Sequence, residues 1–258
     1  MAAKKESVTR TILVALMVCL VCSVVVSVAA VALKPIQTAN QLLDKQRNIL
    51  LIAGLLEPGV PVEEQFKKIT PRLVDLRTGE FSDEMDPLTY DQQRAAGDPE
   101  MSRRLTGAED IASIRRQEYF ATVYMVEGDD GIEIMILPIH GYGLWSTLYG
   151  FLALEGDLNT IRGLGFYEHA ETPGLGGEVD NPQWREMWKG NLVYSDDGEV
   201  GVQIVKGSVD GSSPRRQYQV DGLAGATLTS RGVENLVRFW MGESGFSPFL
   251  RNLRSGEA

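Results

Sequence analysis

Residues 221–230 read Asp-Gly-Leu-Ala-Gly-Ala-Thr-Leu-Thr-Ser, and this stretch decides how the C-terminal part of the chain is built. It joins a strand-like region to a run with helical periodicity, RGVENLVRFWMGE, at residues 231–243. Its two glycines permit the tight backbone that a turn between these elements requires. Thr229 or Ser230 is predicted to cap the start of the helix. Taken alone, a glycine-rich turn before a capped helix is a structural element.

The same turn is also a favourable place for a phosphate group. At a helix start, backbone N–H groups without intrahelical partners and the positive end of the helix dipole both favour an anion. The turn is not a Walker A loop, because no Gly-Lys-Ser/Thr sequence follows it. The hydroxyl of Thr227 is placed in this turn, where a phosphate diester can be held.

The chain before this turn is rich in strand signals. The run 119–128 and the run 131–141 flank Asp129-Asp130-Gly131, which is a hairpin signal. Further strand-like runs lie at residues 146–156, 159–169 and 201–207, and a short Trp-rich helix is expected at 182–190. These patterns predict an α+β fold, with one mixed, mostly antiparallel sheet and helices packed against it.

The N-terminal region predicts a membrane anchor. Residues 12–33 contain no charged side chain, and as an α-helix this length spans the roughly 30 Å hydrocarbon layer of a bilayer. Lys4, Lys5 and Arg10 precede this run, so the positive-inside rule places the N-terminus in the cytoplasm. A cleaved signal peptide is the alternative, but its apolar core usually runs only about 7–15 residues.

Three segments follow from this topology. They are a cytoplasmic N-terminus at residues 1–11, a transmembrane helix at 12–33 and an extracytoplasmic domain at 34–258. The domain is expected to begin with an amphipathic helix after Pro35 that ends near Gly54 or Gly59. The acidic and polar residues 77–104 are interpreted as a surface excursion of that domain.

Composition argues against several classes of function. The formal net charge of −10 makes a nucleic-acid-binding surface improbable. Cys19 and Cys22 are the only cysteines, and both fall in the apolar run, so the outer domain has neither a disulfide nor a cysteine-ligated metal site. His140 and His169 are the only histidines, and no Gly-x-Ser-x-Gly sequence is present. We therefore expect no metal site and no hydrolase triad.

The turn at Asp221–Thr227 resembles the Ser/Thr-Gly-Ala-Thr flavinylation motif of the FMN-binding domain family. Ala224 stands where that family usually has Ser or Thr. The resemblance implies that the phosphate of FMN is esterified to Thr227, with Gly225 and Ala226 beside it. Thr229 is the nearest rival acceptor.

Two further motifs resemble the same family. Glu171-Thr172-Pro173-Gly174-Leu175-Gly176 resembles its E-T-P-G-L-G element, and Gly141-Tyr-Gly-Leu-Trp145 resembles its G-x-G-L-W element. A Trp beside glycines can offer its aromatic face to a flavin ring. The resemblance implies that the flavin ring contacts Trp145, Glu171, Thr172, Gly174 and Leu175. Lys206 is a candidate partner of the phosphate or the flavin.

This domain family occurs in the C subunit of the Na⁺-translocating NADH:quinone reductase and in the G subunit of the related Rnf electron-transport complex. Total length, the Gly177-Glu178 extension and the polar insertion before residue 118 favour the first of these. The resemblance implies an electron relay in the bacterial inner membrane, with its large domain in the periplasm. Expected partners are the B, D and E subunits of the reductase and a flavin transferase. The alternatives are the Rnf protein and a flavin-free anchored module for assembly or ligand binding.

Overall fold

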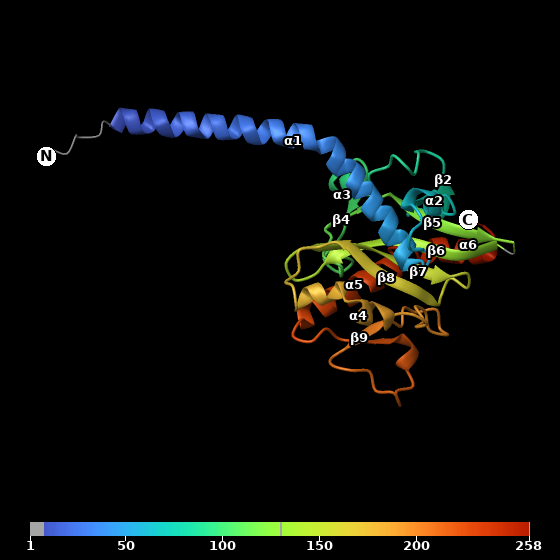
Figure 1. Cartoon of the computed structure of the whole chain (residues 1–258). Coiled ribbons are helices and arrows are strands. Elements are labelled where there is room, and N and C mark those ends of the chain that lie inside the picture. The colour runs from blue at the N-terminus through green and yellow to red at the C-terminus, as the bar shows by residue number, and fades with distance from the viewer. Residues whose placement is uncertain (1–7, 130, 258) are drawn as a thin grey trace. The chain divides into compact units, whose positions relative to one another are not determined.

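Figure 1 shows a computed structural model of the protein, which describes residues 8–129 and 131–257. The chain divides into two compact units between Asp44 and Lys45. One long helix, α1 (Val8–Ile52), supplies the described part of the first unit and the first residues of the second. The predicted cytoplasmic segment 1–11 lies partly outside the described residues, as do Lys4 and Lys5.

Helix α1 contains the expected apolar segment. It is long and apolar enough to cross a membrane, and none of its most apolar window is buried within the protein. The helix continues through Pro35 rather than restarting after it. A proline inside a helix removes one hydrogen bond, and here the remaining helical bonds carry the chain across that gap. The residues expected to form a second, amphipathic helix are therefore the continuation of α1.

Helix α1 ends at Ile52, two residues before Gly54, which is one of the two predicted stop signals. Gly54 has a φ of +68°, a conformation that glycine adopts without steric cost. The amide of Leu55 donates to the carbonyl of Leu50 at 2.8 Å, and the amide of Gly54 donates to that of Leu51 at 3.1 Å. These two bonds form a Schellman motif, which satisfies carbonyl groups at the helix end.

A six-stranded antiparallel sheet forms the centre of the second unit, in the order β2-β1-β5-β6-β7-β8. Its strands are β1 (Thr70–Asp75), β2 (Glu80–Ser82), β5 (Phe120–Gly128), β6 (Gly131–Tyr142), β7 (Thr147–Glu155) and β8 (Ile161–Glu168). Both predicted hairpins are present, as β5–β6 and β7–β8. Asp130, in the first predicted turn, lies outside the described residues.

Two short ladders stand apart from this sheet. They are β3 (Ser102–Arg104) with β4 (Arg116–Glu118), which is antiparallel, and β9 (Gln203–Val205) with β10 (Gln219–Asp221), which is parallel. The run 201–207 was predicted as strand-like, and β9 forms within it. Among the described residues β9 pairs with β10, the strand that leads into the turn at 221–230, rather than with the central sheet.

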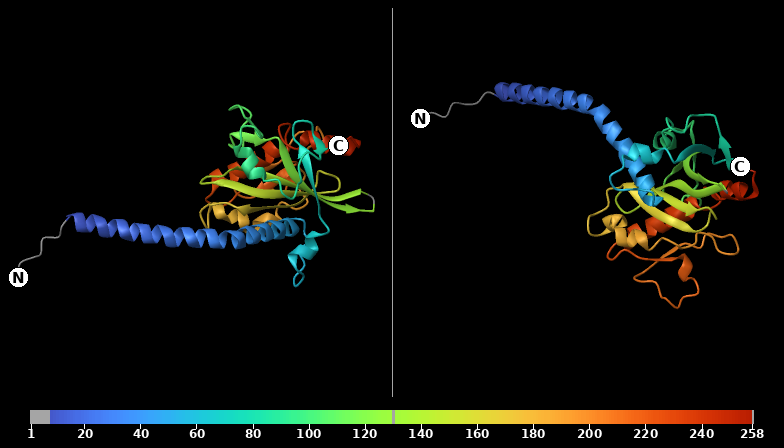
Figure 2. Two further views of the ribbon diagram at one scale, coloured as in Figure 1. Left: turned by 90° about the horizontal axis from the view of Figure 1, so that it is seen from above. Right: turned by 45° about the vertical axis from the view of Figure 1, so that its right-hand side comes forward.

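The remaining elements are short helices and two longer C-terminal ones. They are α2 (Val62–Phe66), α3 (Gln92–Gly97), η1 (Gly176–Asp180), α4 (Pro182–Glu186), η2 (Arg216–Tyr218), α5 (Thr227–Trp240) and α6 (Ser247–Ser255). Helix α5, drawn in red in Figure 2, packs along β6. The segment 77–104 is an ordered excursion, held for example by the Tyr90 hydroxyl donating to the carbonyl of Phe120 at 2.9 Å.

The central sheet is buried on both faces, and strand β6 shows why. Side chains alternate across a strand, so a strand covered on both sides is apolar at nearly every position. Met135, Leu137 and Ile139 belong to the core shared with α5, whereas Ile134 and Ile136 belong to the core shared with the last turns of α1. Helix α5 is thus fixed against a rigid sheet, with its N-terminus at the glycine-rich turn.

Candidate functional site

The candidate site begins at the N-terminus of α5. Ala226 is the N-cap residue, and no side chain of the described residues caps this helix. The prediction that Thr229 or Ser230 caps it is wrong, because both lie inside the first turn and are buried. Their hydroxyls have other partners: that of Ser230 accepts from the amide of Leu223 at 3.0 Å, and that of Thr229 donates to Glu171. The helix start is therefore free of side-chain caps.

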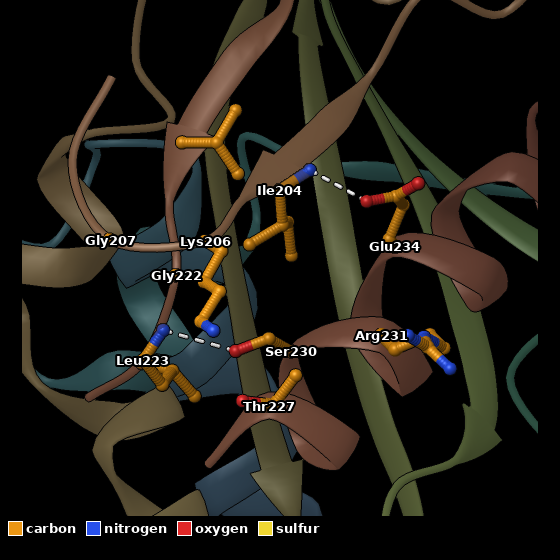
Figure 3. A pocket seen from close by; sticks show the side chains of 10 residues that line it. Ile204, Lys206, Gly207, Gly222, Leu223, Thr227, Ser230, Arg231 and Glu234 are labelled. Atoms are coloured by element: carbon orange, nitrogen blue, oxygen red, sulfur yellow. Dashed lines mark hydrogen bonds between the residues drawn. The ribbon is translucent and has the colours of Figure 1, made fainter. Parts of the chain in front are cut away.

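Thr227 is the first residue of α5, one step further into the helix than the turn predicted for it. It is exposed, and it lines a cavity of about 320 Å³. The same cavity is lined by Lys206, Gly222, Ser230, Arg231 and Glu234 (Figure 3). The hydroxyl of Thr227 thus borders a space that two basic side chains also border.

Residues of β9 and α5 line this cavity, and a hydrogen bond joins the two elements. The amide of Ile204 donates to Oε2 of Glu234 at 2.8 Å, as drawn in Figure 3. This bond ties β9, which ends one residue before Lys206, to the second turn of α5. The placement of Lys206 near the helix start therefore depends on Glu234.

The E-T-P-G-L-G segment lies against the turn before α5. Gly225 has a φ of +72°, and a Cβ atom there would lie 3.0 Å from Cδ2 of Leu175. Gly174 also has a positive φ, +75°, which permits the reversal that brings Leu175 to this place. Two segments some 50 residues apart in sequence therefore meet at Gly225.

Glu171 joins the three motif segments. Its side chain is buried, and its residue is only 5% exposed. Oε1 accepts hydrogen bonds from the amides of Leu144 at 3.0 Å and Trp145 at 2.9 Å, with that of Ser146 at 3.4 Å. Oε2 accepts from the hydroxyl of Thr229 at 2.7 Å. One carboxylate therefore links the Trp145 turn, its own segment and the first turn of α5.

These hydrogen bonds favour the ionised form of the Glu171 carboxyl. Burial by itself raises the pKa of its carboxyl, because water no longer stabilises the anion. The hydrogen bonds from Trp145, Thr229, Leu144 and Ser146 outweigh burial and hold the pKa of this carboxyl below its usual range. Glu171 is therefore ionised at neutral pH.

Several large apolar side chains are exposed around the start of α5. Trp145 is 65% exposed, Leu175 is 45% exposed and Leu228, next to Thr227, is 55% exposed. Leu144 and Tyr142, on the Trp145 turn, are exposed as well. Exposed apolar groups that gather in one place typically mark a binding surface. A flat ligand at the start of α5 would therefore find exposed apolar side chains on the Trp145 turn, on the Leu175 segment and on α5 itself.

Comparisons with known proteins show which family the chain is similar to. A profile of the FMN-binding domain family matches residues 143–242. The C subunit of the Na⁺-translocating NADH-quinone reductase from Pseudomonas aeruginosa is 61% identical over 260 residues, covering 99% of this chain and all of the relative. The corresponding protein from Yersinia pestis is 50% identical, covering 97% of this chain and 95% of the relative.

The chain belongs to the C-subunit family of Na⁺-translocating NADH-quinone reductases. A crystal structure of NqrC from Shewanella oneidensis superposes with a TM-score of 0.75 at 37% identity, covering 81% of this chain and 96% of that one. Membership of this family confirms the predicted FMN-binding fold. It also confirms the preference for the reductase over the Rnf complex, because both relatives are C subunits of the reductase.

The residues present in this member of the C-subunit family fit an FMN. The uncapped N-terminus of α5 offers amide donors to a phosphate, and Lys206 and Arg231 border the same cavity. Trp145 and Leu175 offer apolar surface to a flat ring. Among the residues that the structure describes, no group of three or more His, Cys, Asp or Glu side chains could hold a metal ion.

Sequence reasoning missed Arg231 and the role of Glu171. Arg231 follows Thr227 by four residues, and this spacing places two side chains on the same helix face, so the signal was present. Glu171 was expected to contact the flavin ring, a contact that stays a prediction. Its carboxylate oxygens are occupied by groups of the protein, from residues 25 to 58 positions away in sequence.

Proposed function

We propose that this chain is an electron-transfer subunit of a Na⁺-translocating NADH-quinone reductase, with FMN joined through a phosphoester to Thr227. The observation that carries this proposal is the contrast between two threonines of one helical turn. Thr227 is exposed and borders the cavity, so its hydroxyl is accessible. Thr229 is fully buried, and its hydroxyl donates to Glu171. Access therefore favours Thr227 over its rival.

Electrostatics at the helix start support a phosphodiester at Thr227. A phosphodiester carries one negative charge, and an anion at a helix N-terminus gains roughly 0.3–1 kcal/mol at an exposed position. Lys206 and Arg231 add two positive charges around the same cavity, and Glu234 adds one negative charge, so these three side chains leave a net positive charge there. Gly225 and Ala226 bring the backbone of the turn next to the acceptor, and Gly225 adopts a positive φ to do so.

The ring of the flavin is proposed to lie toward Trp145 and Leu175, the exposed apolar side chains of the two other motifs. Thr172 is exposed on the same segment as Leu175, and Gly174 leaves the backbone there open to a flat ligand. When bound, FMN supplies one-electron chemistry to the protein. The residues of the chain hold the cofactor and orient its ring, and the covalent bond prevents its dissociation.

The partners follow from membership of a multi-subunit complex. Other subunits of the reductase are its partners, and we propose that the B, D and E subunits are the nearest of them. In this proposal NADH and quinone bind elsewhere in the complex, and this chain passes electrons between neighbouring redox centres. A flavin transferase is the proposed helper that attaches FMN.

The chain is anchored in the membrane by the apolar part of α1. We propose that it crosses the bacterial inner membrane once, through residues 12–33. The basic residues before this run place the N-terminus in the cytoplasm, and residues 34–258 then lie in the periplasm. The cysteines Cys19 and Cys22 are free and exposed on this helix, and the proposal gives them no role.

The acceptor is tested by two substitutions in the first turn of α5. The full chain is expressed with a flavin transferase and run on a denaturing gel under ultraviolet light. Thr227→Ala should fold and show no fluorescent band. Thr229→Ala should keep the band while losing about 1–3 kcal/mol of stability, because Glu171 loses a buried hydrogen bond.

The opposite pattern, with the band lost only in Thr229→Ala, would move the attachment to Thr229. A band in both variants would refute attachment in this turn. A wild-type protein without any flavin would favour the flavin-free anchored module. The intact mass of each variant, measured with and without the transferase, provides the same comparison without a gel.

A further inference from the structure

We propose that Glu171 is a positioning residue, whose carboxylate sets the distance between the turn that carries Trp145 and the helix that carries Thr227. This role rests on the proposed function only in so far as Thr227 attaches FMN. Glu171 touches neither the acceptor hydroxyl nor the cavity next to it among the described contacts. It acts on the flavin site through the two segments that it holds.

The hydrogen bonds of Glu171 divide between these two segments. Oε1 serves the turn alone, through the amides of Leu144 and Trp145. Oε2 serves the helix alone, through the hydroxyl of Thr229, two residues after the acceptor. Hydrogen bonds to an ionised group are shorter and roughly twice as strong as neutral ones. The carboxylate thus bridges two elements that are not adjacent in the sequence.

Glycines on each side of Glu171 make room for this bridge. A Cβ atom at Gly143 would lie 2.6 Å from Oε1 of Glu171. A Cβ atom at Gly176 would lie 2.5 Å from Oε2 and 2.6 Å from the hydroxyl oxygen of Thr229. Real Cβ atoms do not approach so closely, so either added methyl group would force the bridge apart. Gly232 also lets α5 approach the carbonyl of Tyr142, which a Cβ atom there would meet at 2.5 Å.

Hydrogen bonds also hold the backbone around Glu171 in place. Its amide donates to Nδ1 of His169 at 3.2 Å, and Nε2 of His169 lies 2.8 Å from Oδ2 of Asp180. The neighbouring amide of Ala170 donates to the hydroxyl of Ser146 at 2.7 Å. These contacts fix the point from which the carboxylate reaches both segments.

Two measurements on the full chain in detergent test this role. The first is the hydrogen-exchange rate of the amides of Leu144 and Trp145 before FMN is attached. The second is the initial rate of FMN attachment by a flavin transferase. Three variants separate reach from charge: Glu171→Gln keeps the reach and loses the charge, Glu171→Asp keeps the charge and loses one methylene, and Glu171→Ala loses both.

Reach is the property that the bridge requires. We expect Glu171→Asp and Glu171→Ala to exchange these two amides at least tenfold faster than wild type, which corresponds to about 1.4 kcal/mol. Their rates of FMN attachment should fall at least tenfold. Glu171→Gln should keep the exchange rates of the two amides and the rate of FMN attachment close to the wild-type values, because its amide oxygen still accepts hydrogen bonds from the turn. Gly176→Ala should resemble Glu171→Ala, since its methyl group displaces the same two oxygens.

Glu118→Gln is the matched control. Glu118 is a buried glutamate of the same domain, 1% exposed, and its contacts lie with Gln92 and His140 rather than with this site. It should leave both the two amides and the rate of attachment unchanged. A merely structural role for Glu171 would lower the melting temperature while leaving the attachment rate of the folded fraction at the wild-type value.

Two results would overturn the proposal. One is unchanged exchange at Leu144 and Trp145 in Glu171→Ala, and the other is a Glu171→Gln variant as impaired as Glu171→Ala in both measurements. Failure of the proposed function appears differently, as wild-type protein that takes no FMN at Thr227. The exchange measurement is made before attachment, so it still decides whether the bridge exists.

Discussion

The buried pair Glu118 and His140 gives a prediction that does not depend on the flavin. Glu118 is 1% exposed and His140 is 7% exposed, and His140 Nε2 lies 3.9 Å from Glu118 Oε2. Oε1 of Glu118 accepts from Nε2 of Gln92 at 2.5 Å, whereas Oε2 has no hydrogen-bond partner among the described residues. Burial raises the pKa of Glu118 to about 7 and lowers the pKa of His140 to about 4.

The two groups change stability with pH in opposite directions. Between pH 4.5 and 7, unfolded Glu118 has lost a proton that the folded protein keeps, so its contribution to stability is lost as pH rises. Between pH 4 and 6.5, unfolded His140 binds a proton that the folded protein excludes, so its contribution is lost as pH falls. Each shift corresponds to about 3 kcal/mol. From pH 4.5 to 6.5 the two effects cancel in the wild-type protein.

Single substitutions should reveal each slope. In Glu118→Gln we expect the unfolding free energy to rise by about 3 kcal/mol as pH increases from 4.5 to 6.5, because His140 is then the only group of the pair that titrates. In His140→Gln we expect the unfolding free energy to fall by about the same amount as pH increases over this range, because Glu118 is then the only group of the pair that titrates. Urea unfolding of the full chain in detergent, followed by far-ultraviolet circular dichroism, measures both, and the wild-type protein is the reference.

A flat profile in both variants would refute this reasoning, because it would mean that the pKa values of the two groups are not shifted by burial. Slopes of the opposite sign would also refute it. A small slope in the wild-type protein is compatible with the cancellation, provided that the two single variants diverge from it in opposite directions.

Two further predictions concern the apolar side chains near Thr227 and the topology. Trp145→Ala should leave unfolding free energy within about 0.5 kcal/mol of wild type, because the indole is 65% exposed; it should change the absorbance or reduction potential of bound FMN while attachment persists, and unchanged values would assign Trp145 no contact with the ring. A protease added to intact spheroplasts should digest the large domain, and digestion only after lysis would place residues 34–258 in the cytoplasm.

The strands that the sequence predicted are those with strong local signals. The hairpin β5–β6 corresponds to two long apolar runs separated in the sequence by Asp-Asp-Gly, and both strands are buried on two faces. β1, which reads Thr-Pro-Arg-Leu-Val-Asp, was not predicted, because its proline and charges mask the strand pattern. β9 was predicted as a strand, but its partner β10 could not be inferred, since pairing depends on contacts distant in sequence.

The candidate site, like the sheet, could be predicted only in part from the sequence. Thr227, Gly225 and Lys206 were predicted as site residues from short motifs, and the structure brings Thr227 and Lys206 to one cavity. The start of α5 was misplaced, because a threonine or serine near a helix start suggests a cap. Thr229 is instead buried, and its hydroxyl donates to Glu171, which lies 58 residues earlier in the sequence. A hydroxyl with two possible partners cannot be assigned from local sequence, because the choice depends on which one the fold brings within reach.

Retention and orientation of the proposed cofactor depend on different groups. A bond to Thr227 would fix only the phosphate end of FMN, and the ring would remain free to turn about several single bonds of the linking chain. Electron transfer between fixed centres needs a defined ring position, which we propose to come from noncovalent contacts with Trp145 and Leu175. These side chains lie on segments that meet α5 through Glu171 and Gly225. The buried carboxylate therefore complements the covalent bond, because it fixes the surface on which the tethered ring is proposed to rest.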